Sequence, residues 1–116
     1  MPNIAELLEK KCHPQETGLT GREVAEYLAT LDGWALQEDK IVKVFEFKNY
    51  YETLAFINAI AYVIHAEDHH PELIVTYNRC IVKFNTHSVN NGNGGISEND
   101  FICAAKVDAI FQQSFA

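Results

Sequence analysis

Residues 65–87 read HAEDHHPELIVTYNRCIVKFNTH, and this stretch carries the clearest structural signals in the chain. Pro71 cannot continue a helix, because its ring clashes with the preceding turn and it has no amide hydrogen to donate. After it, residues 73–77 and 80–84 are rich in β-branched and aromatic side chains, and the polar pair at 78–79 separates them. The stretch therefore predicts a helix that ends near the proline, followed by a β-hairpin.

The helix expected before the proline covers residues 50–65. Its apolar side chains recur at positions 50, 54, 57, 61 and 64, and Phe56, Ile60 and Val63 lie beside them. This spacing is typical of an amphipathic helix, here with an unusually wide apolar face. Such a face predicts burial on two sides, for example against a sheet and against a partner subunit.

A second hairpin and another helix are expected before this long helix. Residues 34–37 and 41–47 flank the polar turn 38–40, and the β-rich composition of the second stretch predicts paired strands. Further upstream, Thr20 and the glutamate three residues later have the spacing of a capping box. The apolar face that follows predicts a helix over residues 20–31.

The N-terminal part of the chain gives weak signals for secondary structure, whereas the C-terminal part predicts a clear helix. Residues 2–8 predict a short helix, and residues 11–19, with a proline and a glycine, indicate a connector. Residues 90–95 are rich in Asn and Gly and predict a flexible loop. Ser97 then caps a last helix that extends to about residue 112, with Asp100 at its third position.

Together these elements predict an α+β fold in the order α-β-β-α-β-β-α. We expect a four-stranded antiparallel sheet made of two hairpins, with two to three helices packed on one face. A length of 116 residues fits a single domain over residues 1–116, in which residues 1–19 form an N-terminal extension.

Composition narrows the class of protein. Nine basic and sixteen acidic residues give a net charge of −7, which argues against a nucleic-acid surface. No apolar run approaches the roughly 20 residues of a membrane-spanning helix, so no membrane role is expected. The cysteines, Cys12, Cys80 and Cys103, are odd in number and form no C-x-x-C pair. We therefore expect a soluble protein in a reducing cytoplasm, with Cys80 and Cys103 buried as small apolar residues.

Four of the five histidines fall within residues 65–87, and His69 and His70 are adjacent at the predicted helix exit. His87 is expected to end the fourth strand, at the same end of the hairpin as His70. Asp100 could then reach an imidazole N–H and fix its tautomer. This arrangement favours general acid–base chemistry, and no serine or cysteine beside it suggests a covalent nucleophile.

The spacing His65-x3-His69-His70-Pro71-x5-Tyr77-x9-His87-x12-Asp100 resembles the signature of the pterin-4a-carbinolamine dehydratase family. The predicted order of elements, Gly33-Trp34 and the stretch Phe45-Glu46-Phe47-Lys48 resemble the family too. The chain departs from the pattern in two places. His65 stands where the family often has glutamate, and the loop at 90–95 is extended.

The resemblance implies a hydro-lyase that dehydrates 4a-hydroxytetrahydropterin to quinonoid dihydropterin by metal-free histidine catalysis, with no cofactor. It implies that His69 is the acid at the 4a-oxygen, that His70 and His87 bind the ring and serve as base or alternate acid, and that Asp100 orients His87. The residues expected to bind substrate are Trp34, His65, Glu67, Asp68, Pro71, Thr86 and Ser88.

The resemblance also implies a cytoplasmic homodimer or homotetramer, linked in bacteria to pterin recycling for phenylalanine hydroxylase. Two alternatives remain open from the sequence. One is a metal site, because His65 and His69 have the i, i+4 spacing that can hold zinc, with His87 and Asp100 to complete it. The other is a protein that binds partners as a dimerisation cofactor.

Overall fold

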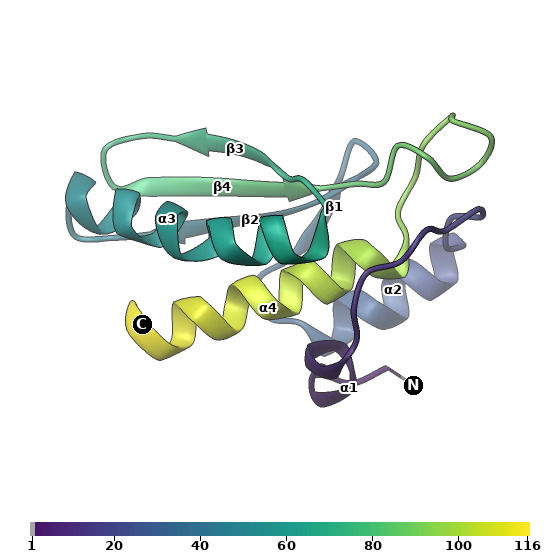
Figure 1. The fold of residues 1–116 in the computed structure, drawn as a ribbon, viewed down its shortest axis with the longest axis horizontal. Coiled ribbons are helices and arrows are strands. Elements are labelled where there is room, and N and C mark those ends of the chain that lie inside the picture. Colours follow the sequence, from purple (N-terminus) through teal and green to yellow (C-terminus); the bar gives the residue numbers. More distant parts are fainter. Residues whose placement is uncertain (1) are drawn as a thin grey trace.

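A computed structural model describes residues 2–116, in which one antiparallel sheet lies over a layer of helices (Figure 1). The strands pair in the order β1-β2-β4-β3, so the two hairpins meet through β2 and β4. This arrangement confirms the predicted α+β fold class. The strands are β1 Ala35–Gln37, β2 Lys40–Glu46, β3 Glu72–Val75 and β4 Arg79–Phe84. The helices are α1 Ile4–Glu9, α2 Gly21–Thr30, α3 Tyr50–Glu67 and α4 Glu98–Ser114.

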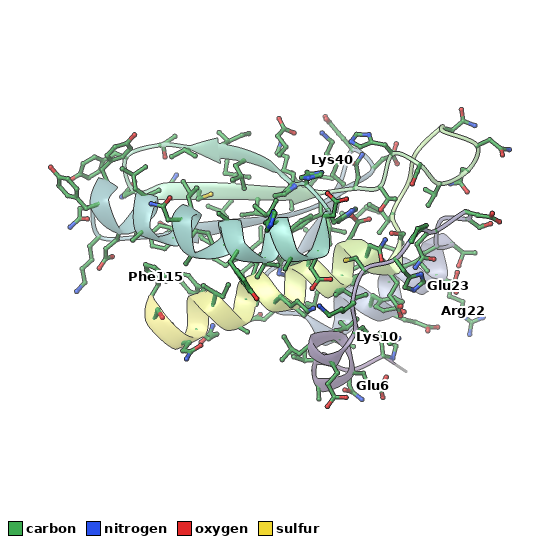
Figure 2. The ribbon with its side chains drawn as sticks, in the orientation of Figure 1. Glu6, Lys10, Arg22, Glu23, Lys40 and Phe115 are labelled. Atoms are coloured by element: carbon green, nitrogen blue, oxygen red, sulfur yellow. The ribbon has the colours of Figure 1, made fainter. Side chains whose placement is uncertain are left out.

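The core lies between the sheet and the two long helices, α3 and α4. Strand side chains alternate between the two faces of a sheet, and in β4 this alternation buries Cys80, Val82 and Phe84 on the helix side. Phe56 of α3 and Phe101 of α4 meet them from below and are fully buried. Figure 2 shows Phe115, at the end of α4, beside α3, and its ring lies 5.7 Å from that of Phe56.

The first hairpin turns tighter than the sequence indicates. Glu38 and Asp39 both have positive φ, 51° and 64°, which is the geometry of a two-residue hairpin loop. Lys40 therefore pairs with Gln37 and belongs to β2 rather than to the turn. The sequence does not show that Lys40 pairs with Gln37, because lysine fits a turn and the edge of a strand equally well and residues 38–40 form one polar stretch.

The predicted capping box at Thr20 is present, and the predicted cap at Ser97 also forms a capping box. The Thr20 hydroxyl accepts a hydrogen bond from the amide of Glu23, whose carboxylate accepts the amide of Thr20 in return. Ser97 and Asp100 form the corresponding pair at the start of α4. Each box satisfies amides that the first turn of a helix leaves without a partner, so the helix starts are fixed by local sequence.

The N-terminal segment is packed into the fold. Leu7 of α1 is buried, α1 rests on α4, and the chain then runs past the start of α4 (Figure 1). Lys10, labelled in Figure 2, forms an ion pair of 2.8 Å with Glu98 in the first turn of α4.

The loop predicted at 90–95 is tied to this N-terminal segment. The Asn90 amide donates to the Glu16 carbonyl at 2.8 Å, and the Asn90 side chain accepts the amide of Gly18 at 3.1 Å. A Cβ at Gly18 would come within 2.9 Å of the Asn90 side chain, so glycine is what permits this close approach.

None of the helices in residues 2–116 combines the length and apolar character that crossing a bilayer requires.

Candidate active site

A cavity of about 300 Å³ opens where the N-terminal segment, the end of α3, the chain after β4 and the first turn of α4 meet. Its size lies at the lower end of the range for small-molecule sites. Its lining residues are Cys12, His13, Pro14, Gln15, Glu67, Asp68, His69, Thr86, Ser88 and Asn99.

His69 is placed in this cavity by the way α3 ends. Asp68 takes a left-handed conformation with φ of 50° and caps the helix, so the chain turns sharply there. The imidazole of His69 is then largely covered and lies parallel to the ring of Phe84, with 5.9 Å between the ring centroids. The helix exit and the end of β4 together hold the imidazole plane.

Asp100 fixes the tautomer of that imidazole. The Asp100 carboxylate is completely buried, and its Oδ1 lies 2.6 Å from Nε2 of His69. An ionised carboxylate can only accept hydrogen bonds, so Nε2 must carry the proton. Nδ1 of His69 is consequently the nitrogen left for a ligand, as base when neutral and as acid when protonated.

The second oxygen of Asp100 is also fully engaged. Oδ2 accepts hydrogen bonds from the Thr86 hydroxyl and from the Ser97 amide, each at 2.9 Å. Since the Thr86 proton goes to Asp100, the 2.7 Å contact between the two hydroxyls must be donated by Ser97. This network holds the carboxylate rigidly under His69.

The predicted contact between Asp100 and His87 is wrong. Asp100 binds His69 instead, and the side chain of His87 is exposed. The physical reason is the alternation of side chains along an extended chain. Phe84 and Thr86 face inward, so His87 faces outward, and β4 ends at Phe84, before His87 is reached.

Trp34 is likewise not where the pocket prediction puts it. It is 6% exposed and packs in the core, 6.1 Å from Phe45 and 6.0 Å from Phe84 between ring centroids. Its Nε1 donates to Asp108 at 2.9 Å. Burial raises the pKa of Asp108, although hydrogen bonds from Lys43 and Trp34 oppose that shift. The indole therefore has a polar partner in the core and does not line the cavity.

The other predicted site residues divide into two groups. Those that line the cavity are Glu67, Asp68, His69, Thr86 and Ser88. Those that do not line it are His65, His70, Pro71 and His87. His70 has 71% of its side chain exposed and lies 3.4 Å from the Asp68 carboxylate.

Glu67 joins the end of α3 to the N-terminal segment. One of its oxygens accepts the Cys12 amide at 2.8 Å, and the other lies 2.6 Å from Nζ of Lys106. Burial acts to raise the pKa of Glu67, but the hydrogen bonds from Lys106 and Cys12 outweigh it, and the pKa is lowered. Glu67 is thus held as a buried carboxylate.

Cys12 and Cys103 bring two thiols together at the edge of the cavity, with their sulfur atoms 3.5 Å apart. The hydrogen bond between the two thiols, together with burial, raises the pKa of the Cys103 thiol. Burial also raises the pKa of Cys80, to about 11. Neither buried thiol is an activated nucleophile, because the thiolate is the reactive form.

Five residues of the cavity escaped the sequence interpretation: Cys12, His13, Pro14, Gln15 and Asn99. The first four belong to a segment that looks like a connector, and Asn99 looks like an ordinary residue of a helix start. Their contacts run largely through backbone atoms, which leave no pattern in the sequence.

The alternative of a metal site gains no geometric support. Within residues 2–116, no three His, Cys, Asp or Glu side chains converge in a way that could hold an ion. His65 lies in α3, but the helix ends at Glu67, before His69. His65 is also exposed, while Nε2 of His69 binds Asp100.

Comparison with known proteins agrees with this geometry. The sequence model of the family described as pterin 4 alpha carbinolamine dehydratase matches residues 17–110. A protein of Bdellovibrio bacteriovorus, named provisionally as such a dehydratase, is 64% identical over all of this chain and 97% of its own length. A Nitrosomonas europaea protein with the same provisional name is 49% identical, over 97% of this chain and 99% of its own.

A solved structure gives the same result. The crystal structure of a transcriptional coactivator/pterin dehydratase from Brucella melitensis superimposes with a TM-score of 0.74 at 36% identity. The match covers 81% of this chain and 98% of the Brucella chain. With a family match over most of its length and relatives this similar, the chain belongs to the pterin 4 alpha carbinolamine dehydratase family.

Proposed function

We propose that this protein is a hydro-lyase that converts 4a-hydroxytetrahydropterin to quinonoid dihydropterin and water. The observation that carries the proposal is the hydrogen bond of 2.6 Å between His69 and the buried Asp100, on the wall of a cavity of about 300 Å³. It leaves one imidazole nitrogen, Nδ1, available to a ligand. Family membership supports the identity of the substrate.

In the proposed mechanism, protonated His69 donates the proton on Nδ1 to the 4a-oxygen of the pterin. The bond between C4a and oxygen then breaks, water leaves, and the electron pair of a ring nitrogen forms the new double bond. That nitrogen gives up its proton to a base, so the total number of protons on the site is unchanged. Transfer of a proton from that base to His69, directly or through solvent, then restores the starting protonation state. General acid–base assistance of this kind contributes roughly 10²–10⁴-fold to a rate.

Asp100 has a defined part in this scheme. Its fixed position orients the imidazole of His69 and keeps the proton of the neutral form on Nε2. His70 and His87 are the proposed partners for the second proton transfer and for ring binding. Each is next in sequence to a residue that lines the cavity, although both side chains are exposed.

The proposed reaction proceeds without a metal or cofactor and supports the recycling of tetrahydropterin, for example beside phenylalanine hydroxylase. The test is an assay on synthetic 4a-hydroxytetrahydropterin that follows the absorbance of the quinonoid product, before and after dialysis against a chelator. We expect a protein-dependent acceleration that the chelator leaves unchanged. No acceleration would refute the proposed function, and a loss of activity on chelation that metal restores would favour the metal alternative.

Association through α3 is a second property that the surface supports. Tyr51 is 80% exposed and Tyr62 75% exposed on this helix, with Leu54 on the same side. Exposed aromatic groups in a row often mark a protein interface. We therefore propose that the chain forms a homodimer or homotetramer through this face. Light scattering on a Tyr62→Asp variant tests this, because an unchanged mass would exclude the face.

A further inference from the structure

The N-terminal segment Cys12–Gln15 forms one wall of the cavity, yet it lies outside the part of the chain that the family model matches, residues 17–110. Four of the ten lining residues come from this segment. The wall is therefore a feature of this chain that lies outside the residues matched by the family model. The backbone contacts of this segment determine which of its side chains can bind a ligand.

The segment is anchored through its backbone. The side chain of Asn99, only 6% of whose surface is exposed, accepts the His13 amide at 3.2 Å and donates to the His13 carbonyl at 2.7 Å. Glu67 accepts the neighbouring Cys12 amide at 2.8 Å. Backbone anchoring leaves the His13 and Gln15 side chains free for each other and for a ligand.

The His13 ring determines how the Gln15 carboxamide is oriented. Nδ1 of His13 lies 3.3 Å from the Pro14 carbonyl oxygen, which can only accept, so a neutral ring carries its proton on Nδ1. Nε2 is then an acceptor, and it lies 3.3 Å from the Gln15 side chain. Only the nitrogen of the carboxamide can donate to it. The reverse orientation would set an oxygen against a bare ring nitrogen.

The contact with His13 uses only one of the hydrogen-bonding groups of the Gln15 carboxamide. The Gln15 nitrogen keeps one N–H, and no group in residues 2–116 donates a hydrogen bond to its Oε1. Gln15 is half-buried and lines both the cavity beside His69 and a neighbouring hollow bounded by Ser88 and Asn91. An acceptor and a donor thus stand side by side, with fixed orientation, at the junction of the two.

We propose that Gln15 is a specificity-determining residue that pairs with the lactam edge of the pterin, an inference that rests on the proposed function. That edge carries an N–H donor at N3 beside the acceptor oxygen at C4. Oε1 of Gln15 accepts from N3–H, and the remaining N–H donates to the oxygen. In a 2,4-diaminopteridine, N3 carries no hydrogen and the group at C4 is an amino group. The acceptor Oε1 then faces the acceptor N3, the N–H of Gln15 faces another donor, and both contacts become repulsive. Because His13 prevents the carboxamide from turning over, the site selects the 4-oxo form.

The test is fluorescence titration of the protein with 7,8-dihydropterin and with its 2,4-diamino counterpart, neither of which can be dehydrated. We expect the wild type to prefer the 4-oxo ligand by about tenfold or more, since a mismatched pair costs roughly 1.4 kcal/mol or more. Gln15→Ala should raise the Kd of the 4-oxo ligand about tenfold and abolish the preference. Gln113→Ala, at an exposed glutamine far along α4, is the matched control and should bind like the wild type.

Two further variants distinguish the recognition of the ligand by Gln15 from the orientation of Gln15 by His13. Gln15→Glu keeps the length of the side chain but removes its donors, so it too should lose the preference. His13→Ala should bind the 4-oxo ligand nearly as well but with a smaller preference, because the carboxamide can then turn over. An unchanged preference in His13→Ala would contradict the orienting role of His13.

The two proposals fail in different ways. If the wild type binds both ligands but does not dehydrate 4a-hydroxytetrahydropterin, the proposed function fails. If the wild type is active and Gln15→Ala keeps both its KM and the wild-type preference, with its unfolding temperature unchanged, the role of Gln15 is refuted. The expected result is a KM raised about tenfold with kcat within about twofold of the wild type.

Discussion

Nε2 of His69 lies 2.6 Å from Oδ1 of Asp100, so the residue at the end of α3 is bound to a buried carboxylate in the first turn of α4. The neighbours of Asp100 act in the same way on other segments. Glu98 pairs with Lys10, and Asn99 holds the backbone of His13. One helical turn therefore assembles the cavity, and changes within it should have separable effects.

Replacing Asp100 with asparagine should lower kcat by about 10–100-fold. The position of Oδ2 receives two donors, from Thr86 and Ser97, so the amide oxygen of the variant stays there. The amide nitrogen then faces His69 and donates to Nε2, which moves the imidazole proton to Nδ1. Steady-state kinetics and nitrogen NMR of the His69 ring measure the two effects.

Asp39→Asn, in the exposed first hairpin turn, is the matched control for the Asp100 variant. It should keep the wild-type rate and the wild-type ring spectrum. An Asp100→Asn enzyme with full activity and an unchanged tautomer would show that the carboxylate does not act through His69.

Asn99→Ala should loosen the N-terminal wall without removing a group that contacts the reacting atoms. The backbone amide and carbonyl of His13 lose their partners, which costs about 1–3 kcal/mol of stability. Amide exchange at Cys12 and His13 should become faster, and KM should rise more than kcat falls. Asn93→Ala, in the exposed part of the 90–95 loop, is the control, and equal exchange in both variants would contradict the anchoring role.

Acid should destabilise the contact between Glu67 and the N-terminal segment. The folded-state pKa of Glu67 lies below its usual value of 4.5, so its stabilising contribution is fully present above that pH. The contribution is lost as the pH falls through the lower folded-state pKa. Glu67→Gln should therefore be less stable than the wild type at pH 7, and its stability should depend less on pH below about 4.5.

Denaturant unfolding at a series of pH values between neutral and acid measures the Glu67 effect. Glu9→Gln, at an exposed carboxylate at the end of α1, supplies the comparison. Parallel stability curves for the wild type and Glu67→Gln would mean that this carboxylate is not held by Lys106 and Cys12.

Trp34→Phe should destabilise the fold by about 1–3 kcal/mol, because the buried Asp108 loses a hydrogen-bond donor. The kinetic constants should change little, since the indole does not line the cavity. Thermal unfolding and the dehydratase assay, run on the same preparation, separate the two. A raised KM with unchanged stability would instead show that Trp34 contacts the substrate.

The elements that sequence predicts well here are those set by neighbours along the chain. Both capping boxes depend on residues three positions apart, and Pro71 keeps α3 from continuing, so that the helix ends shortly before it, at Glu67. The partner of Asp100 is a different matter. Both His69 and His87 are expected at the end of the hairpin that lies near Asp100. Thr86 faces inward and binds Asp100, so the next residue, His87, faces outward and cannot bind it.

Other features of the site could not be predicted because they depend on tertiary contacts. Trp34 fits a core or a pocket equally well until Asp108, more than seventy residues later, is found beside it. The wall at Cys12–Gln15 is held through main-chain atoms, which every sequence possesses. The extended loop at 90–95 reveals its role only when Asn90 is seen bound to Gly18.

The central claim is that His69, held by Asp100, is the acid–base residue of the dehydration. It is tested most directly by comparing kcat for 4a-hydroxytetrahydropterin in His69→Ala, His70→Ala and His87→Ala, each with its unfolding temperature measured. We predict a loss of roughly 10²-fold or more for His69→Ala and smaller losses for the other two. A His69→Ala enzyme that retains near-wild-type kcat, or one less impaired than His70→Ala or His87→Ala, would contradict it.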